Sequence, residues 1–203
     1  MPDETPIVIT RTAGSAAATF PTVGITQSQL VFWLNQDSSK AAHWPVFPNG
    51  LQPRTQVGFG DTSDKLQPST GDANFPAQLN QGQVYTVSYG CKISGHSSEH
   101  GQVQVVLDFF SNPNQLTDAV LNTPYPVTHL TQGGMPPFVF NLFDVTLPKG
   151  MAITNDPVSG ATISGTPTEA GDSFAFSMHC EDSFKNAVDQ TYLLRVTQPV
   201  PVT

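Results

Sequence analysis

The sequence predicts an all-β protein that contains two β-sandwich domains, and three observations predict it. The chain has 16 glycines and 18 prolines among 203 residues, and both residue types destabilise helix interiors, so long helices are not expected. Short segments alternate between apolar and polar residues, with the two-residue period of a half-buried strand. Turn-forming residues separate these segments at a spacing of roughly 8–12 residues, which is typical of a sandwich made of many short strands.

Several segments in the first half of the chain are predicted to be strands. Residues 7–9 are β-branched, and residues 30–34 form a continuous apolar run that suits a sandwich core. Residues 83–91 alternate cleanly, which predicts an inward face made of Tyr85, Val87, Tyr89 and Cys91. The next inward row is predicted to consist of Val103, Val105, Leu107 and Phe109. The two rows together predict a hairpin-like unit.

Two loops are predicted before this hairpin. Residues 41–50 place His43 among small and aromatic residues and ahead of two prolines, which predicts a stiff loop rather than a regular element. Residues 51–80 contain three glycines and several proline, aspartate and serine residues, so they predict a long irregular excursion. Loops of this length in compact domains often have a functional role.

A second set of strands is predicted after an interruption at residues 111–125. The expected strands lie at residues 125–130, 138–140, 161–167, 174–180 and 192–196. Cys180 falls in an inward row with Phe174, Phe176 and Met178, so it is predicted to be a buried core thiol. We place the domain boundary between residues 112 and 113, which gives domains 1–112 and 113–203.

The charge pattern excludes some classes of partner. Sixteen acidic and eight basic side chains give a net charge of −8, which argues against nucleic acid and anionic membranes as partners. No run of 18 apolar residues exists, so no membrane insertion is expected. The low content of charged residues is typical of an exported bacterial protein. We expect a periplasmic or extracellular location with the leader absent from this sequence, and a cytoplasmic location is the alternative.

The predicted hairpin connection carries the residues with the strongest chemical signal. Cys91, His96 and His100 lie within ten positions, at the point where one strand ends and the next begins. A thiolate with two imidazoles suits copper best and zinc second. His43, from the upstream loop, would complete a trigonal site with two histidines and one cysteine. The alternative is a metal-free strand-end thiol with solvated histidines, and Glu99 is expected to be solvated.

This connection resembles the copper loop of azurin-type cupredoxins. The family spaces its ligands as Cys-x4-His-x3-Met, and the present chain has Cys-x4-His-x3-His-Gly beginning at Cys91. Residues 35–37 followed by His43 likewise resemble the strand and loop that supply the first histidine ligand of that family. The resemblance implies a cupredoxin-like Greek-key sandwich for residues 5–110, and it implies a set of metal ligands made of His43, Cys91, His96 and His100.

The sequence departs from the cupredoxin pattern at two positions. His100, with Glu99 beside it, stands where the family has the axial methionine, and Trp44 stands where the family usually has a polar residue. A stronger fourth donor predicts weaker blue colour, a lower reduction potential and a red or type-2-like spectrum, and the site would also accept zinc. The fourth donor itself stays open between His100, Glu99 and a backbone carbonyl.

The second half of the chain resembles a different family. Residues 147–151 read LPKGM and residues 163–171 read ISGTPTEAG, which are the identifying turns of the Ig-like (cadherin-like) modules of bacterial surface and exported proteins. The resemblance covers residues 117–199. It implies an Ig-like sandwich that serves as a spacer or contacts another protein, another domain or a carbohydrate.

Three functions follow for this chain, in order of preference. The first is a copper-binding protein that transfers single electrons or holds copper and has a redox protein as its partner. The second is an exported binding or adhesion protein in which the cupredoxin fold is a metal-free scaffold and residues 51–80 carry recognition. The third is a copper enzyme with an open coordination position. No nucleophile pattern, phosphate loop or paired-carboxylate motif is present, so an electron carrier or binding protein is favoured over an enzyme.

Overall fold

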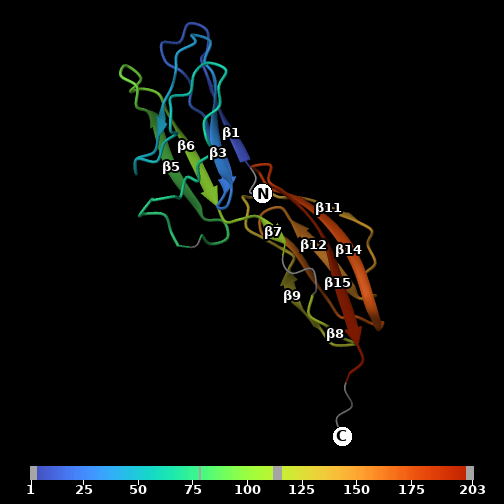
Figure 1. Cartoon of the computed structure of the whole chain (residues 1–203). Helices are drawn as coiled ribbons and strands as arrows, with labels where there is room; N and C mark the ends of the chain where they lie inside the picture. Colours follow the sequence, from blue (N-terminus) through green and yellow to red (C-terminus); the bar gives the residue numbers. More distant parts are fainter. Residues whose placement is uncertain (1–3, 78, 112–115, 200–203) are drawn as a thin grey trace. The chain divides into compact units, whose positions relative to one another are not determined.

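The computed structural model describes residues 4–77, 79–111 and 116–199. The described residues form strands β1 to β15 and no helix, so the all-β prediction is confirmed (Figure 1). None of their segments is a helix with the length and apolar character needed to cross a membrane. The chain divides into two compact units, Met1–Leu107 (unit 1) and Asp108–Thr203 (unit 2). The boundary expected between residues 112 and 113 lies outside the described residues.

Unit 1 is made of two sheets. Strands β1 (Glu4–Thr10) and β3 (Leu30–Gln36) pair in parallel as one sheet. The other sheet has the order β2-β6-β5-β4, with bounds β2 (Thr22–Thr26), β4 (Pro45–Val46), β5 (Val84–Cys91) and β6 (His100–Val106). Within it β2 runs parallel to β6, while β5 is antiparallel to both of its neighbours.

The two sheets of unit 1 enclose one apolar core. The buried residues of this core come from both sheets and include Ile7, Ile9, Val31, Trp33, Val87, Tyr89, Val103 and Val105. Strand β5 buries Val87, Tyr89 and Cys91 and exposes the intervening Thr86 and Ser88, which confirms the alternation predicted for residues 83–91. Because the pleat sends every second side chain inward, Cys91 ends its strand facing the core.

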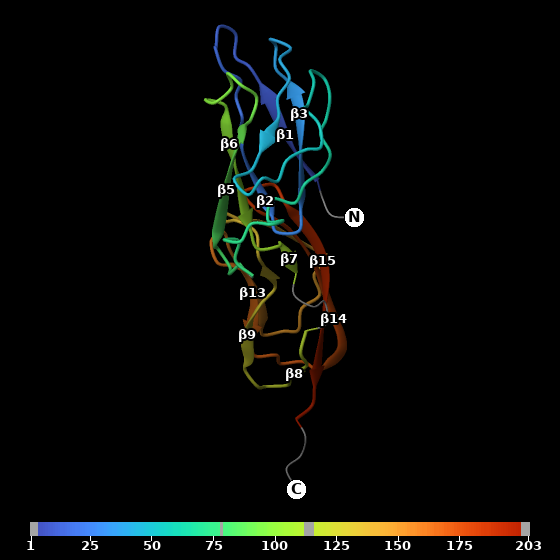
Figure 2. The same ribbon diagram turned by 60° about the vertical axis from the view of Figure 1, so that its left-hand side comes forward.

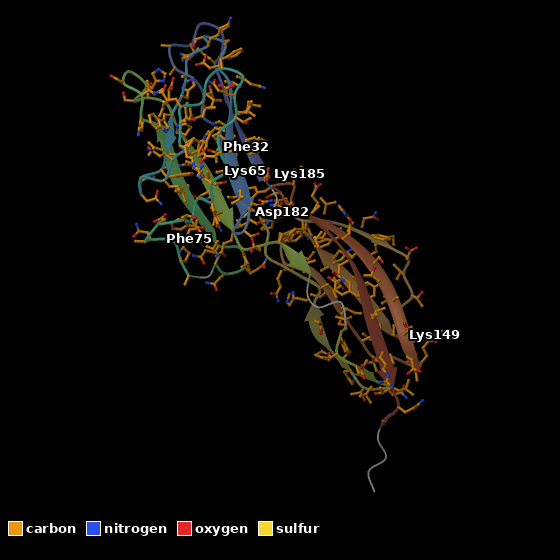
Figure 3. The ribbon with its side chains drawn as sticks, in the orientation of Figure 1. Phe32, Lys65, Phe75, Lys149, Asp182 and Lys185 are labelled. Carbon is orange, nitrogen blue, oxygen red and sulfur yellow. The ribbon has the colours of Figure 1, made fainter. Side chains whose placement is uncertain are left out.

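The segment of residues 51–80 contains no strand among its described residues, as predicted, but it is anchored to the sandwich. Isolated bridges join Leu66 to Val31 and Thr62 to Leu34 along β3. Phe75, labelled in Figure 3, packs edge-on against Tyr85 with 4.9 Å between ring centroids. The excursion therefore covers part of the sandwich instead of extending freely into solvent.

Unit 2 is also built from packed sheets around a core. Its main sheet has the order β11-β14-β15-β8, a second has the order β12-β13-β9, and β7 pairs with β10. Figure 2 labels β14, β15 and β8 of the main sheet and β13 and β9 of the second. The bounds are β7 (Phe110–Ser111), β8 (Ala119–Val120), β9 (Tyr125–His129), β10 (Thr131–Gln132), β11 (Val139–Phe143), β12 (Met151–Asp156), β13 (Gly160–Gly165), β14 (Gly171–Glu181) and β15 (Ala187–Thr197).

The predicted inward row of β14 is confirmed. Phe176, Met178 and Cys180 are buried there, and Cys180 is fully inaccessible. Strand β12 was not predicted, because only Met151 and Ile153 alternate before the segment turns polar.

Asp182, labelled in Figure 3, lies just after β14 and is buried. Its Oδ1 accepts the backbone N–H groups of Phe184 and Asn186, and its Oδ2 accepts the N–H of Met135 and the side-chain amide of Asn186. A carboxylate surrounded by N–H donors stabilises a turn and has no lone pair left for a cation. Asp182 is therefore a structural residue.

Gly101 on β6 offers a test of the packing in unit 1. A β-carbon at this position would lie 2.6 Å from the Tyr89 hydroxyl and 2.7 Å from the Pro21 carbonyl oxygen, which are joined by a 2.8 Å hydrogen bond. We expect Gly101→Ala to lower the free energy of unfolding of unit 1 by about 1–3 kcal/mol, because the close-packed groups must separate. Urea unfolding followed by tryptophan fluorescence measures it, since both tryptophans, Trp33 and Trp44, belong to unit 1.

The matched control is Gly90→Ala on the neighbouring strand. A β-carbon at Gly90 meets nothing closer than 3.4 Å, so the change in the free energy of unfolding should stay below about 0.5 kcal/mol. Equal unfolding midpoints for the two variants would show that the Tyr89–Gly101 contact is not as tight as described.

Candidate metal centre

The β5–β6 connection folds back over Cys91 through two successive turns. The N–H of His96 donates to the Ile93 carbonyl, the N–H of Glu99 donates to the His96 carbonyl, and the N–H of Cys91 donates to the Glu99 carbonyl, at 3.0, 3.0 and 2.9 Å. Gly95 adopts φ of +89°, a left-handed conformation that glycine reaches without strain. The two turns place the side chains of His96 and Glu99 beside the thiol that ends β5.

His43 reaches the same place from the loop before β4. The β4–β5 ladder pairs Pro45 with Cys91, so the residues just before Pro45 lie beside the end of β5. The backbone of His43 exchanges two hydrogen bonds with Val57, at 3.1 and 2.8 Å. These contacts fix the position of a histidine whose side chain is completely buried.

Four side chains converge at this end of unit 1. The Cys91 Sγ lies 3.9 Å from His43 Nδ1 and 3.6 Å from His96 Nδ1. The Oε2 atom of Glu99 lies 3.0 Å from His43 Nδ1 and 2.8 Å from His96 Nδ1. All four donor atoms lie within 4.8 Å of one another, and both rings present the same nitrogen to the group.

The separations of these atoms fit coordination of a single ion. With metal–sulfur bonds of about 2.3 Å and metal–nitrogen bonds of about 2.0 Å, angles of roughly 110–130° separate sulfur and nitrogen by about 3.6–3.9 Å. The two observed sulfur–nitrogen distances fall in this range. The shorter oxygen–nitrogen distances correspond to angles of about 90° with similar bond lengths. The carboxylate oxygen would thus serve as a fourth donor to an ion held by the other three.

Glu99 supplies an independent indication that a cation belongs here. Its Oε2 is buried and has no hydrogen-bond partner, although two ring nitrogens lie 3.0 and 2.8 Å from it. The other oxygen, Oε1, accepts the backbone N–H of Ala18 at 2.8 Å and lies 3.4 Å from the guanidinium of Arg11. A buried carboxylate oxygen without a donor is unfavourable unless a positive charge compensates it. The residues present therefore fit a metal ion.

The thiol of Cys91 has the partners that a sulfur ligand needs. The backbone N–H of Trp44 donates to Sγ at 3.4 Å. Burial raises the pKa of the Cys91 thiol, while backbone hydrogen bonds from Trp44 and Ile93 oppose that rise. A bound cation would favour the thiolate further, because the thiolate is the form that coordinates metals.

His43 is held from its far side as well. Its Nε2 lies 2.8 Å from Oδ2 of Asp37, a fully buried carboxylate. Arg11 donates to both oxygens of Asp37, at 2.8 and 2.9 Å. These hydrogen bonds from Arg11 hold the pKa of Asp37 well below its usual range. A charged, hydrogen-bonded pair, Asp37 and Arg11, thus lies behind His43.

The structure separates the sequence-predicted residues into two groups. His43, Cys91 and His96 lie together, whereas His100 lies at the start of β6, exposed, with its backbone paired to Gly90. His100 borders a shallow apolar hollow of about 340 Å³ that is also lined by Val46 and Phe47. Strand parity explains this position: Gly101, Val103 and Val105 face inward, so His100 must face outward.

The environment of Glu99 differs from the one that its local sequence predicts. Glu99 was expected to be solvated, and it is buried with its carboxylate among the other three donors. The three-residue spacing from His96 is a signal that could have suggested this position, because two consecutive turns return the chain to the same side. The burial itself depends on Arg11 and Ala18, which no local pattern connects to Glu99.

The comparisons with known proteins identify no family. No family model matches the chain, and no curated protein matches it. Similar solved structures include extracellular domains 3–5 of Drosophila OTK, with a TM-score of 0.37, 13% identity and coverage of 90% of this chain and 64% of that one. A second is the endo-fucoidan hydrolase MfFcnA4 of glycoside hydrolase family 107, with a TM-score of 0.36, 13% identity and coverage of 92% of this chain and 28% of that one. A third is the multicopper oxidase mgLAC, with a TM-score of 0.31, 10% identity and coverage of 100% of this chain and 88% of that one.

These likenesses are distant. Every TM-score is below 0.5, and the chain spans less than two thirds of the OTK and fucoidan hydrolase chains that it matches. The geometry of the four donors, and not these similarities, supports the function proposed below.

Thiol reactivity tests the environments of the two cysteines. Neither forms a disulfide bond, and both are buried. Burial raises the pKa of Cys180 to about 12. At about pH 8, we expect an aromatic disulfide reagent to leave Cys180 unmodified in the native protein and to modify Cys91 slowly, because thiols react as thiolates. Adding Zn²⁺ first should abolish the reaction of Cys91. The measurement is the absorbance of the released thiol.

Guanidinium-unfolded protein, in which both cysteines react, calibrates this measurement. The Cys180→Ala variant should keep the slow reaction and its suppression by Zn²⁺. Rapid modification of both cysteines in the native protein would contradict their burial.

Proposed function

We propose that unit 1 binds one copper ion and serves as a single-electron carrier or a copper-holding protein, with His43, Cys91, His96 and Glu99 as its ligands. The observation that supports this proposal is the convergence of a thiol and two imidazole nitrogens on the unpartnered Oε2 of Glu99. Thiolate and imidazole donors together suit copper first and zinc second. Glu99 replaces His100 as the proposed fourth donor.

The charge of the donor set favours the divalent state. The thiolate and the carboxylate carry two negative charges, so a divalent ion makes the buried site neutral, while Cu(I) leaves one negative charge. Arg11 and Asp37 offset each other. Uncompensated charge is unfavourable at low dielectric, so the ligands stabilise Cu(II) and lower the reduction potential relative to a site with a methionine thioether in the fourth position. Zn²⁺ satisfies the same charge balance.

The exposure of the proposed ligands suits electron transfer to a partner protein. Copper, when bound, supplies one-electron chemistry, and ligands that are already in place reduce the rearrangement between its two oxidation states. His43 is fully buried, whereas the side chain of His96 keeps 19% of its surface exposed, the largest fraction among the four. We propose that a redox protein contacts the edge of the His96 ring, in the periplasm or outside the cell, and that unit 2 serves as a spacer or contacts a protein or carbohydrate.

Addition of Cu(II) to the purified protein tests the proposal directly. We expect one equivalent to bind and to produce a sulfur-to-copper charge-transfer band in the visible spectrum, because the thiolate of Cys91 is a ligand. Cys91→Ser should abolish the band. Cys180→Ser is the matched control, and it should leave the band intact because Cys180 is buried on β14, in unit 2.

Elemental analysis of protein from copper-supplied cells completes this test. Protein with neither a visible band nor bound metal would support the metal-free scaffold instead. A band that shifts on addition of azide would indicate an open coordination position and would favour an enzyme.

The identity of the fourth ligand is tested by two methionine variants. We expect Glu99→Met to increase the blue absorption and raise the reduction potential, because a neutral thioether replaces an anionic donor. His100→Met should leave both quantities unchanged, since His100 faces away from the four donors. Visible spectra and voltammetry of the copper-loaded variants measure the effects. A shift caused by His100→Met alone would identify His100 as the fourth ligand.

A further inference from the structure

Two further charged side chains lie beside the metal centre: Asp37, which is buried, and Arg11, which is partly buried. We propose that Asp37, clamped by Arg11, is a positioning residue that fixes the protonated nitrogen of His43 and so keeps the other nitrogen available as a donor. This inference rests on the proposed function, because it assigns the partner that prepares one ligand of the same site. Asp37 itself contacts no other donor of the metal centre.

Three N–H donors bind the carboxylate of Asp37, and the fourth contact of this carboxylate is with His43. Its Oδ1 accepts the Nε–H of Arg11 and the backbone N–H of Ser39, both at 2.8 Å. Its Oδ2 accepts an Nη2–H of Arg11 at 2.9 Å and contacts His43 Nε2 at 2.8 Å. The carboxylate is fully buried and meets donors at every contact, and an ionised carboxylate can only accept hydrogen bonds. The proton of the last contact therefore belongs to His43.

The position of this proton decides what the opposite nitrogen can do. A neutral imidazole carries one N–H, so a proton held at Nε2 leaves a lone pair at Nδ1, the atom that faces Cys91 and Glu99. Metal-ligating histidines commonly donate their second nitrogen to a carboxylate in this way, which fixes the ring and raises its basicity. Asp37 thus favours the tautomer of His43 that can bind a metal.

Arg11 connects this carboxylate to the other acidic ligand. Its guanidinium donates to both oxygens of Asp37, and its Nη2 lies 3.4 Å from Oε1 of Glu99. Its Nη1 donates to the carbonyl of Ala16 at 2.5 Å, which ties the arginine to the loop before β2. A single cation therefore holds the two carboxylates that lie on opposite sides of His43. A lysine in this place would lack the planar fork that engages both oxygens of Asp37 at once.

The first test uses the metal-free wild-type protein and needs no variant. In nitrogen-15 spectra that correlate ring nitrogens with ring protons, we expect His43 Nε2 to carry a proton. An unprotonated Nε2 would overturn the proposal. Because this readout does not depend on bound metal, a failure of the proposed copper function and a failure of the Asp37 assignment are distinguishable.

The second test replaces the acceptor. An asparagine side chain can donate its amide to Nε2, which moves the ring proton to Nδ1 and blocks that lone pair. We expect Asp37→Asn to lower the affinity for Zn²⁺ by about 10–100-fold, the range for loss of such a partner, and to move the His43 proton from Nε2 to Nδ1. The reduction potential of the copper form should rise, since the ring becomes a weaker donor.

Asp189→Asn is the matched control. Asp189 also contacts a histidine ring, with 2.6 Å between its Oδ1 and Nδ1 of His179, but this pair is exposed on β14 and β15 of unit 2. Its replacement should change the affinity for Zn²⁺ by less than about twofold, as for a surface pair. An unchanged Zn²⁺ affinity in Asp37→Asn, with the protein folded by tryptophan fluorescence, would overturn the positioning role.

Arg11→Lys keeps the charge and loses the bidentate contact, and it covers the case in which Asp37→Asn fails to fold. We expect a smaller loss of Zn²⁺ affinity than for Asp37→Asn and retention of the proton on His43 Nε2. A wild-type Zn²⁺ affinity in Arg11→Lys would show that the clamp is not needed.

Discussion

A buried carboxylate governs the architecture around the metal centre. Glu99 is buried beside a largely apolar core, and removal of a carboxylate from water is strongly unfavourable unless donors or cations replace the water. The chain provides the N–H of Ala18 and the guanidinium of Arg11 for one oxygen, and two histidine nitrogens lie near the other. The loop between β1 and β2, the loop that carries His43 and the β5–β6 connection therefore all place polar groups around the Glu99 carboxylate.

The electrostatics of the site follow from the same constraint. Arg11 carries one positive charge, whereas Asp37 and Glu99 carry two negative charges within its reach. The protein groups alone therefore leave a negative excess in a region with little solvent, and the thiolate of Cys91 would add to it. A divalent ion among the donors removes that excess. With that ion, the polar network and the proposed ligands would form one charge-balanced unit.

Local sequence patterns predicted the parts of the molecule that depend on local geometry. The alternation of residues 83–91 predicted β5 and the inward position of Cys91, and the turn residues after it predicted a tight connection that carries His96. Strand parity, had it been applied to β6, would also have placed His100 on the outer face. The burial of Glu99 and the role of Asp37 could not be predicted this way, because their partner Arg11 lies 88 and 26 positions away in the sequence.

The parallel pairing of β2 with β6 has a consequence for when the site forms. This ladder matches Val23 with Val103, so the first part of unit 1 cannot complete its sheet until the last strand is in place. The donors lie between these two strands in the sequence, and His43 is 48 positions away from Cys91, so the unfolded chain does not hold all four donors together. Assembly of the complete proposed site therefore depends on folding of the whole unit. Since an ion that binds only the folded form shifts the equilibrium toward that form, the proposed copper or zinc ion would stabilise folded unit 1.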